Sequence, residues 1–296
     1  MSSSILTNQS AITALQALRM TQSSLAMTQK EISTGLKVSS AADNASTWSI
    51  SQTMKSDQGV LSTISDSLSV SGSLLNVGTA AVNNAITVLN NIKSAVAQAE
   101  DPSADQAKIL TNLQALGKQL TSIVSSASFN GQNLIDGSAA ATDNIVASYS
   151  DGKGSAASSI GTISLTTQAL TNTGNTGLLQ AAQATGSTAA TDFTNLATAD
   201  LASGTIADTL SNADKAIASL TSYSANVGAT YTSVMAQGSF IKTLNDALTS
   251  GVSSLVDADM NEASTKLQAL QTQQQLGVQS LSIANQNSQI IMKLFQ

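Results

Sequence analysis

Few side chains in this sequence could perform catalysis or hold a metal ion. Histidine and cysteine are both absent, which removes the commonest general base, the imidazole metal ligand, every thiolate and every disulfide. The segment Gly152-Lys153-Gly154-Ser155 contains the glycine and lysine of a phosphate-binding loop, but the upstream glycine at the required spacing is missing. We therefore interpret this segment as a turn, and we expect no enzyme activity, no cofactor and no metal site.

The composition argues against several further classes of function. Charged residues make up 10% of the 296 positions, against about 25% in an average protein, and the net charge is −6. An acidic chain without a basic stripe is a poor ligand for nucleic acid. No stretch approaches the length of apolar sequence that spans a membrane. The first thirty residues lack the basic start and apolar block of a cleavable secretion signal, so none is expected.

One long helix is predicted from Ile50 to Ala99, because apolar residues recur there every seven positions. The main file consists of Met54, Leu61, Leu68, Leu75, Val82, Leu89 and Val96. A second file, which begins at Ile50, is offset from it by three or four residues, as in the seam of a coiled coil. About fifty helical residues form a rod of roughly 75 Å, so a partner helix is expected.

The partner is predicted from Ile206 to Leu255, where the same spacing continues. Its seam residues include Leu210, Ile217, Val227, Val234, Ile241 and Leu248. A shorter helix between the two rods follows Pro102, the single proline, and Ser103 with Gln106 has the spacing of a capping box. These patterns predict an elongated antiparallel helical bundle whose chain reverses near Pro102.

Amphipathic helices are also predicted at both ends of the chain, over residues 5–36 and about 260–295. Their apolar positions are Leu15, Leu18, Leu25 and Ile32 in the first helix, and Leu267, Leu270, Leu281, Ile283, Ile290 and Leu294 in the last. The last helix is apolar on two sides, and such a helix needs more than one neighbour. We therefore expect the terminal helices to be loose until an assembly covers their second faces.

The central segment differs in style from the flanking helices. Ile145, Ala147 and Tyr149 alternate with polar residues, and so do Ile163 and Leu165, which predicts a β-hairpin. The remainder is rich in Gly, Ala, Ser and Thr and is expected to form a short surface region. The predicted fold class is therefore mainly α, with a small central region that contains a hairpin.

Several linked motifs resemble bacterial flagellins, the subunits of the flagellar filament. Residues 32–45 have the sequence ISTGLKVSSAADNA, which is similar to the amino-terminal signature of that family. Residues 5–8 resemble the family's opening, and 129–131 its loop after the third helix. Gly277, Leu281 and residues 284–286 match its carboxy-terminal pattern, although Ser288 stands where many members have proline. The resemblance covers roughly residues 1–137 and 205–296.

The resemblance implies an organisation in five segments. Residues 1–44 and 258–296 would form an inner helical domain, the former ending in a spoke at Ser39–Asp43 with Asp43 as N-cap of the long rod. Residues 45–143 and 205–257 would form an outer rod domain, and 144–204 a variable surface region. Members of this family polymerise into the filament, line its central channel with their terminal helices, and drive swimming as a helical propeller.

The resemblance also implies partners and a location. The chain would form a homopolymer, alone or with other flagellins. It would pass uncleaved through the flagellar type III export apparatus with a chaperone bound to its C-terminus, and would meet the filament cap and the hook–filament junction proteins. Its location would be extracellular, in the flagellum, without binding nucleic acid or membrane.

Three other interpretations remain to be compared with this one. A hook–filament junction protein shares the terminal helices, but the quality of the signature favours flagellin. A signalling coiled coil would need membrane spans or a partner-binding hairpin tip. An enzymatic insert of the zinc-peptidase kind would need histidines, which the sequence lacks.

Overall fold

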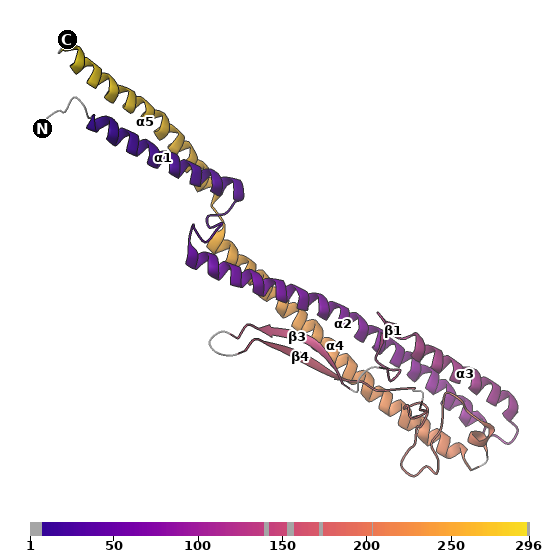
Figure 1. The fold of residues 1–296 in the computed structure, drawn as a ribbon. Helices are drawn as coiled ribbons and strands as arrows, with labels where there is room; N and C mark the ends of the chain where they lie inside the picture. Colours follow the sequence, from indigo (N-terminus) through magenta and orange to yellow (C-terminus); the bar gives the residue numbers. More distant parts are fainter. Residues whose placement is uncertain (1–7, 139–141, 153–156, 172–173, 203, 295–296) are drawn as a thin grey trace. The chain divides into compact units, whose positions relative to one another are not determined.

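The computed structural model describes residues 8–138, 142–152, 157–171, 174–202 and 204–294 (Figure 1). In chain order the elements are α1 (Gln9–Thr34), α2 (Ala45–Gln98), α3 (Gln106–Ser126), β1 (Ser128–Phe129), β2 (Gln132–Asn133), β3 (Thr142–Ser150), β4 (Ser159–Thr166), the 3-10 helix η1 (Thr198–Leu201), α4 (Ile206–Val256) and α5 (Met260–Leu294). The prediction of a mainly α chain with a small β-hairpin is confirmed. The chain divides into two compact units, Met1–Gln58 with Asp246–Gln296 and Gly59–Asn245.

The second unit contains most of the buried core, and α2 supplies much of it. The predicted file is buried at Leu61, Leu68, Leu75, Val82, Leu89 and Val96. A further file begins at Leu74 and continues through Ala81, Val88 and Ala95. Figure 1 shows α3 and β1 alongside α2, and a Cβ on Gly78 of α2 would lie 3.3 Å from the Leu134 side chain. This part of α2 therefore packs against neighbours on two sides.

In α4, one part of the predicted seam is buried, and near the start of the helix the buried positions differ from the predicted ones. Ala213, Leu220, Val227, Val234 and Ile241 are buried as the spacing predicts. Leu210 and Ile217 are only half-buried, and the buried positions beside them are Thr209, Ala216 and Tyr223. The reason is a second neighbour: the Tyr223 hydroxyl donates to the backbone oxygen of Leu134 at 3.1 Å, and the Thr209 hydroxyl to that of Asp200 at 3.0 Å.

The predicted capping box of Ser103 and Gln106 does not form at the start of α3. The N-cap is Asp105, whose carboxylate accepts a hydrogen bond from the backbone N–H of Lys108. Ser103 instead donates twice to Asp101, and the Gln106 side chain donates to the Ala99 backbone oxygen at 3.4 Å. Asp101, before Pro102, therefore stabilises the turn, and Asp105, after it, caps α3.

The predicted hairpin is present, with an irregularity that the alternation does not reveal. Strands β3 and β4 are antiparallel, with Ile145 opposite Ile163, and the register shifts between Val146 and Ser148. The extra residue at this bulge reverses the facing of the residues beyond it. Tyr149 consequently pairs with Ile160, whose side chain is exposed. The connecting turn predicted at 151–154 is described only as far as Gly152, because residues 153–156 lie outside the described ranges.

The segment after the hairpin is not the solvent-facing region that its composition suggests. Leu170, Leu179, Phe193, Leu196 and Leu201 are almost completely buried. The backbone approaches α3 so closely that a Cβ on Gly117 would lie 2.7 Å from the oxygen of Thr194. Residues 167–171, 174–202 and 204–205 therefore form an irregular layer of the core of the second unit.

Asn212 fastens this layer to α4. Its side-chain oxygen accepts from the backbone N–H of Ala184 at 2.7 Å, and its amide donates to the Ala189 oxygen at 2.9 Å and the Thr191 hydroxyl at 2.8 Å. Asn212 is completely buried, so these bonds replace all of its contacts with water.

Replacement of Asn212 by alanine tests this attachment. We expect Asn212→Ala to lower the free energy of unfolding of the second unit by about 1–3 kcal/mol, because buried partner groups lose their hydrogen bonds. Limited proteolysis should then cut within residues 182–191. Urea denaturation provides the measurement, and Asn76→Ala, at an exposed asparagine of α2, provides the control. Equal stability of the two variants would contradict the attachment.

Candidate assembly surface

The first unit is built around the pairing of α1 with α5, which lie side by side (Figure 1). Helix α1 begins at an N-cap, Asn8, whose side-chain oxygen accepts from Ala11 and whose amide donates to the backbone oxygen of Ala284 at 2.9 Å. It ends at Gly35 in the left-handed conformation, with φ of 70°. Close to the middle of the pair, a Cβ on Gly277 would lie 3.2 Å from the Leu18 side chain.

The interface between α1 and α5 buries little. Among the described side chains of these two helices, only Thr28, Ala263 and Leu270 are buried. The helices have 26 and 35 residues, so most of their surface faces solvent in the single chain. A helix pair with so few buried side chains gains little stability from packing.

The faces turned away from this interface carry large apolar side chains. Leu276 and Ile283 of α5 have 60% and 56% of their surface exposed. The exposed apolar residues of both helices are Ile12, Leu15, Met20, Met27, Met260, Leu276, Val278 and Ile283. Apolar side chains in such number on one helix pair are typical of a surface that another molecule covers.

The predicted interface residues fall into three groups in the structure. Leu18, Leu25, Ile32, Leu267 and Leu281 are half-buried, and Leu270 is buried. Leu15 and Ile283 are exposed. Ile290 and Leu294 belong to α5, but their side chains lie outside the described ones. The list therefore combines residues that hold the helix pair together with residues that the pair leaves uncovered.

A short connecting segment joins α1 to α2 and contacts the break between α4 and α5. Leu36 forms a β-bridge with Asp257, and the N–H groups of Lys37 and Val38 both donate to the backbone oxygen of Val256. Val38, Val252 and Val256 form a small buried cluster, against which Trp48, the single tryptophan, packs. Sequence periodicity did not indicate this cluster, because its residues come from three elements.

Asp43 organises the connecting segment and does not cap α2 as predicted. Its carboxylate accepts from the backbone N–H and hydroxyl of both Ser39 and Ser40, and pairs with the Lys30 ammonium at 3.0 Å. These bonds hold the pKa of Asp43 well below its ordinary value, the bond with Lys30 most strongly. The cap of α2 is Asn44, whose side-chain oxygen accepts from Thr47 at 3.1 Å.

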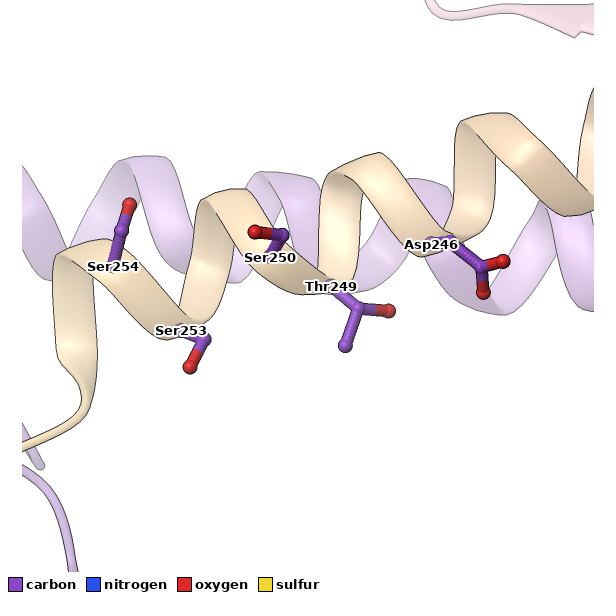
Figure 2. Close-up of a pocket in the computed structure, with 5 residues that line it drawn as sticks. All are labelled: Asp246, Thr249, Ser250, Ser253 and Ser254. Carbon is purple, nitrogen blue, oxygen red and sulfur yellow. The ribbon is translucent and has the colours of Figure 1, made fainter.

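The C-terminal part of α4 has a shallow hollow on its surface, lined by Asp246, Thr249, Ser250, Ser253 and Ser254. Figure 2 shows these side chains spread along the helix, with their oxygen atoms pointing in different directions. The Thr249 hydroxyl is already bonded to the Gln58 amide at 2.7 Å. Donors that do not converge on one point form no catalytic constellation.

Thr28 is an unusual residue in the α1–α5 interface. It is completely buried, and its hydroxyl has no hydrogen-bond partner among the described residues. Thr13, Thr21 and Thr34 of the same helix instead donate to the backbone oxygen four residues earlier. An unsatisfied buried hydroxyl costs about 1–3 kcal/mol, so Thr28 weakens the helix pair in the single chain.

We expect Thr28→Val to stabilise the α1–α5 pair by about 1 kcal/mol, because it keeps the shape of the side chain and removes the unsatisfied group. Hydrogen exchange of the α1 amides in the dissociated protein measures this gain as increased protection. Thr21→Val serves as the control, since it removes a satisfied hydroxyl on the same helix. Protection that is unchanged or reduced in Thr28→Val would refute the interpretation.

The Asp43 contacts predict an acid response of the connecting segment. Because the folded state lowers the pKa of Asp43 below 3.8, its stabilising contribution is complete above that value and is lost as the pH falls below it. We expect the exchange protection of the Ser39 and Ser40 amides and the fluorescence of Trp48 to stay constant from pH 7 to pH 4, and to change as the pH falls below 3.8. Asp43→Asn should show low protection throughout, whereas Asp66→Asn, at an exposed position of α2, should behave as the parent.

Comparison with known proteins finds a family match near each end of the chain. Residues 5–140 match the bacterial flagellin N-terminal helical region, and residues 210–295 match the bacterial flagellin C-terminal helical region. The chain is 39% identical over 295 residues to a flagellin of Brucella melitensis biotype 1, with 99% of each chain covered. It is 38% identical over 322 residues to Flagellin C of Rhizobium meliloti (strain 1021), again with 99% of each covered.

A third relative shows the same extent of similarity. Flagellin FljM of Caulobacter vibrioides is 35% identical over 296 residues, with 99% of this chain and 98% of the relative covered. Within the described ranges, no helix combines the length and hydropathy that crossing a membrane requires. The chain therefore belongs to the bacterial flagellin family, whose members are structural subunits of the extracellular flagellar filament and not enzymes.

Proposed function

We propose that this flagellin polymerises through the α1–α5 pair, whose outer faces become buried against other copies of the chain. The supporting observation is the exposure of Leu276, Ile283, Met20 and Ile12 on helices that bury few side chains against each other. Of the residues predicted from sequence as the assembly interface, we assign the exposed Leu15 and Ile283 to this outer contact and the half-buried and buried residues to the pairing of α1 with α5. The structure adds the other exposed apolar residues of the pair to the outer contact.

Assembly on this proposal is coupled to the ordering of the terminal helices. Fixing one residue costs about 1–2 kcal/mol, so two helices that bury so little in the single chain are held only weakly. Contacts with neighbouring copies then bury the apolar side chains of α1 and α5 and stabilise the two helices. The unsatisfied hydroxyl of Thr28 contributes to this delay, because it lowers the stability of the pair before assembly.

The remaining roles follow from the family and from the segments of the chain. We propose that residues 1–44 and 258–296 form the inner domain that lines the export channel, that 45–143 and 205–257 form the outer rod around a seam of Leu61 to Leu89 and Leu210 to Leu248, and that 144–204 is the variable region. The proposed partners are other flagellins, the export apparatus and its chaperone, the filament cap and the hook–filament junction proteins.

Electron microscopy of the dissociated protein, before and after addition of filament seeds and a precipitating salt, tests polymerisation. Limited proteolysis in parallel reports on the terminal helices. Long filaments in which both termini become protected from the protease support the proposal. Persistent monomers or short capped rods would contradict it and favour a junction protein.

The exposed stripe of α5 gives a sharper test than truncation of the termini. We expect Ile283→Asp to abolish filaments while the circular dichroism of the monomer stays unchanged, because Ile283 is exposed in the single chain and a buried unpaired charge is costly. Leu281→Asp should also prevent filaments, but with loss of α1–α5 pairing. Ile283→Leu keeps the apolar surface and should polymerise normally. Filaments of ordinary length from Ile283→Asp would exclude this face from the contact.

A further inference from the structure

Two methionines of α1 lie on the face that the single chain leaves uncovered. Met20 and Met27 have 66% and 57% of their surface exposed. They are seven residues apart, close to two full turns, and so share one side of the helix. Leu18 and Leu25 precede them by two residues, or about 200° of rotation, and are half-buried on the side of α5. The two thioethers are therefore open to reagents in solution before assembly.

Accessible thioethers are oxidised by peroxides in a simple two-electron reaction. The methionine sulfur attacks one oxygen of hydrogen peroxide, the O–O bond breaks, and a sulfur–oxygen bond forms while water leaves. The sulfur is oxidised and the peroxide is reduced. The product, methionine sulfoxide, is polar and chiral, whereas methionine is a flexible apolar side chain that fills irregular gaps.

We propose that Met20 and Met27 are an oxidation site at which a peroxide arrests polymerisation of the free subunit, and that assembly closes this site. The inference rests on the proposed burial of the outer face of α1. The exposed side chains beside Met20 on this face, Gln16 and Ser23, are neutral, whereas Met27 is followed three and four residues later by the charged Lys30 and Glu31. In the free subunit the sulfoxide oxygen is hydrated, and burial removes that water.

The size of the effect follows from burial of a polar group. A sulfoxide that loses its water without gaining a partner raises the critical concentration for polymerisation by about ten-fold or more. Two adjacent sulfoxides on one subunit act on the same contact. Reduction of the sulfoxides by a methionine sulfoxide reductase restores the thioethers, so the arrest is reversible.

The chain contains its own control for nonspecific oxidation. Met235 lies on α4 in the other unit and is 53% exposed. Its exposed fraction is close to that of Met27, so we expect peroxide to oxidise it too. If oxidation acted through general damage, removal of Met235 would protect polymerisation as well as removal of the α1 methionines.

The experiment compares the parent, Met20→Leu/Met27→Leu and Met235→Leu, each with and without hydrogen peroxide and each in a Met260→Leu background, because Met260 is also exposed on this helix pair. Peptide mass spectrometry measures sulfoxide at each position, and seeded polymerisation measures the critical concentration. We expect the oxidised parent and oxidised Met235→Leu to show at least about a ten-fold rise in critical concentration. Oxidised Met20→Leu/Met27→Leu should polymerise as the untreated parent does.

A second measurement uses only the parent protein and so does not depend on the variants folding. Filaments and free subunits receive the same peroxide, and the oxidation rates of Met20 and Met27 are compared. We expect protection in filaments. Equal rates in the two states, or normal polymerisation of the fully oxidised parent, would overturn the inference while leaving polymerisation itself established. Failure of the untreated parent to polymerise would refute the proposed function, and the inference with it.

Discussion

The packing of α2 against α4 through residues seven positions apart is the contact on which the second unit depends. Leu89 and Val82 on one helix and Leu220 and Val227 on the other are completely buried. The seam fixes how α2 and α4 are rotated about their own axes. The faces that remain then determine which other segments pack against each helix. Helix α3 lies alongside α2 (Figure 1), and residues 174–202 attach to the neighbouring face of α4 through Asn212. A shift of the seam by one residue would displace every one of these attachments.

Serine and threonine usually disfavour helices because their hydroxyls compete for backbone hydrogen bonds. In this chain many of them instead donate to the carbonyl four residues earlier, as Thr63 does to Gly59, Ser69 to Ser65 and Thr87 to Asn83. The helices therefore tolerate a sequence rich in hydroxyls. Their surface is polar without being charged, and each such hydroxyl already has an acceptor within its own helix.

The sequence predicted features that depend on the regular spacing of apolar residues. It missed features that depend on the conformation of one residue, such as a helix cap. The buried file from Leu61 to Leu89 follows from spacing alone, because seven residues always return a helix to nearly the same side. Helix caps are different, because several Asp, Asn and Ser residues near a helix start could each serve as the N-cap. At the start of α2, only the backbone conformation determines that Asn44 and not Asp43 is the cap. Thr28 was missed for a similar reason, since nothing in its neighbours marks its hydroxyl as unsatisfied.

The sequence did not predict the buried residues between Leu170 and Leu201. Phe193 and Leu179 are completely buried, yet they stand among Gly, Ala, Ser and Thr without any regular interval. An irregular segment packs by the particular path of its backbone, which leaves no period to detect. The exposed face of α5 was foreseeable, because two apolar stripes on one helix are visible in the spacing. The matching exposure of α1 was obscured by glutamines between its apolar positions.

The low content of charged residues affects how association between copies of this chain depends on salt and on temperature. Charged residues make up 10% of the chain, and Lys30–Asp43, Lys93–Asp214 and Lys108–Asp105 are ion pairs that each lie within one unit. Contacts between largely neutral surfaces are little affected when dissolved salt screens charges. Burial of apolar surface weakens on cooling, however. Adhesion between such surfaces is therefore governed more by temperature than by ionic strength.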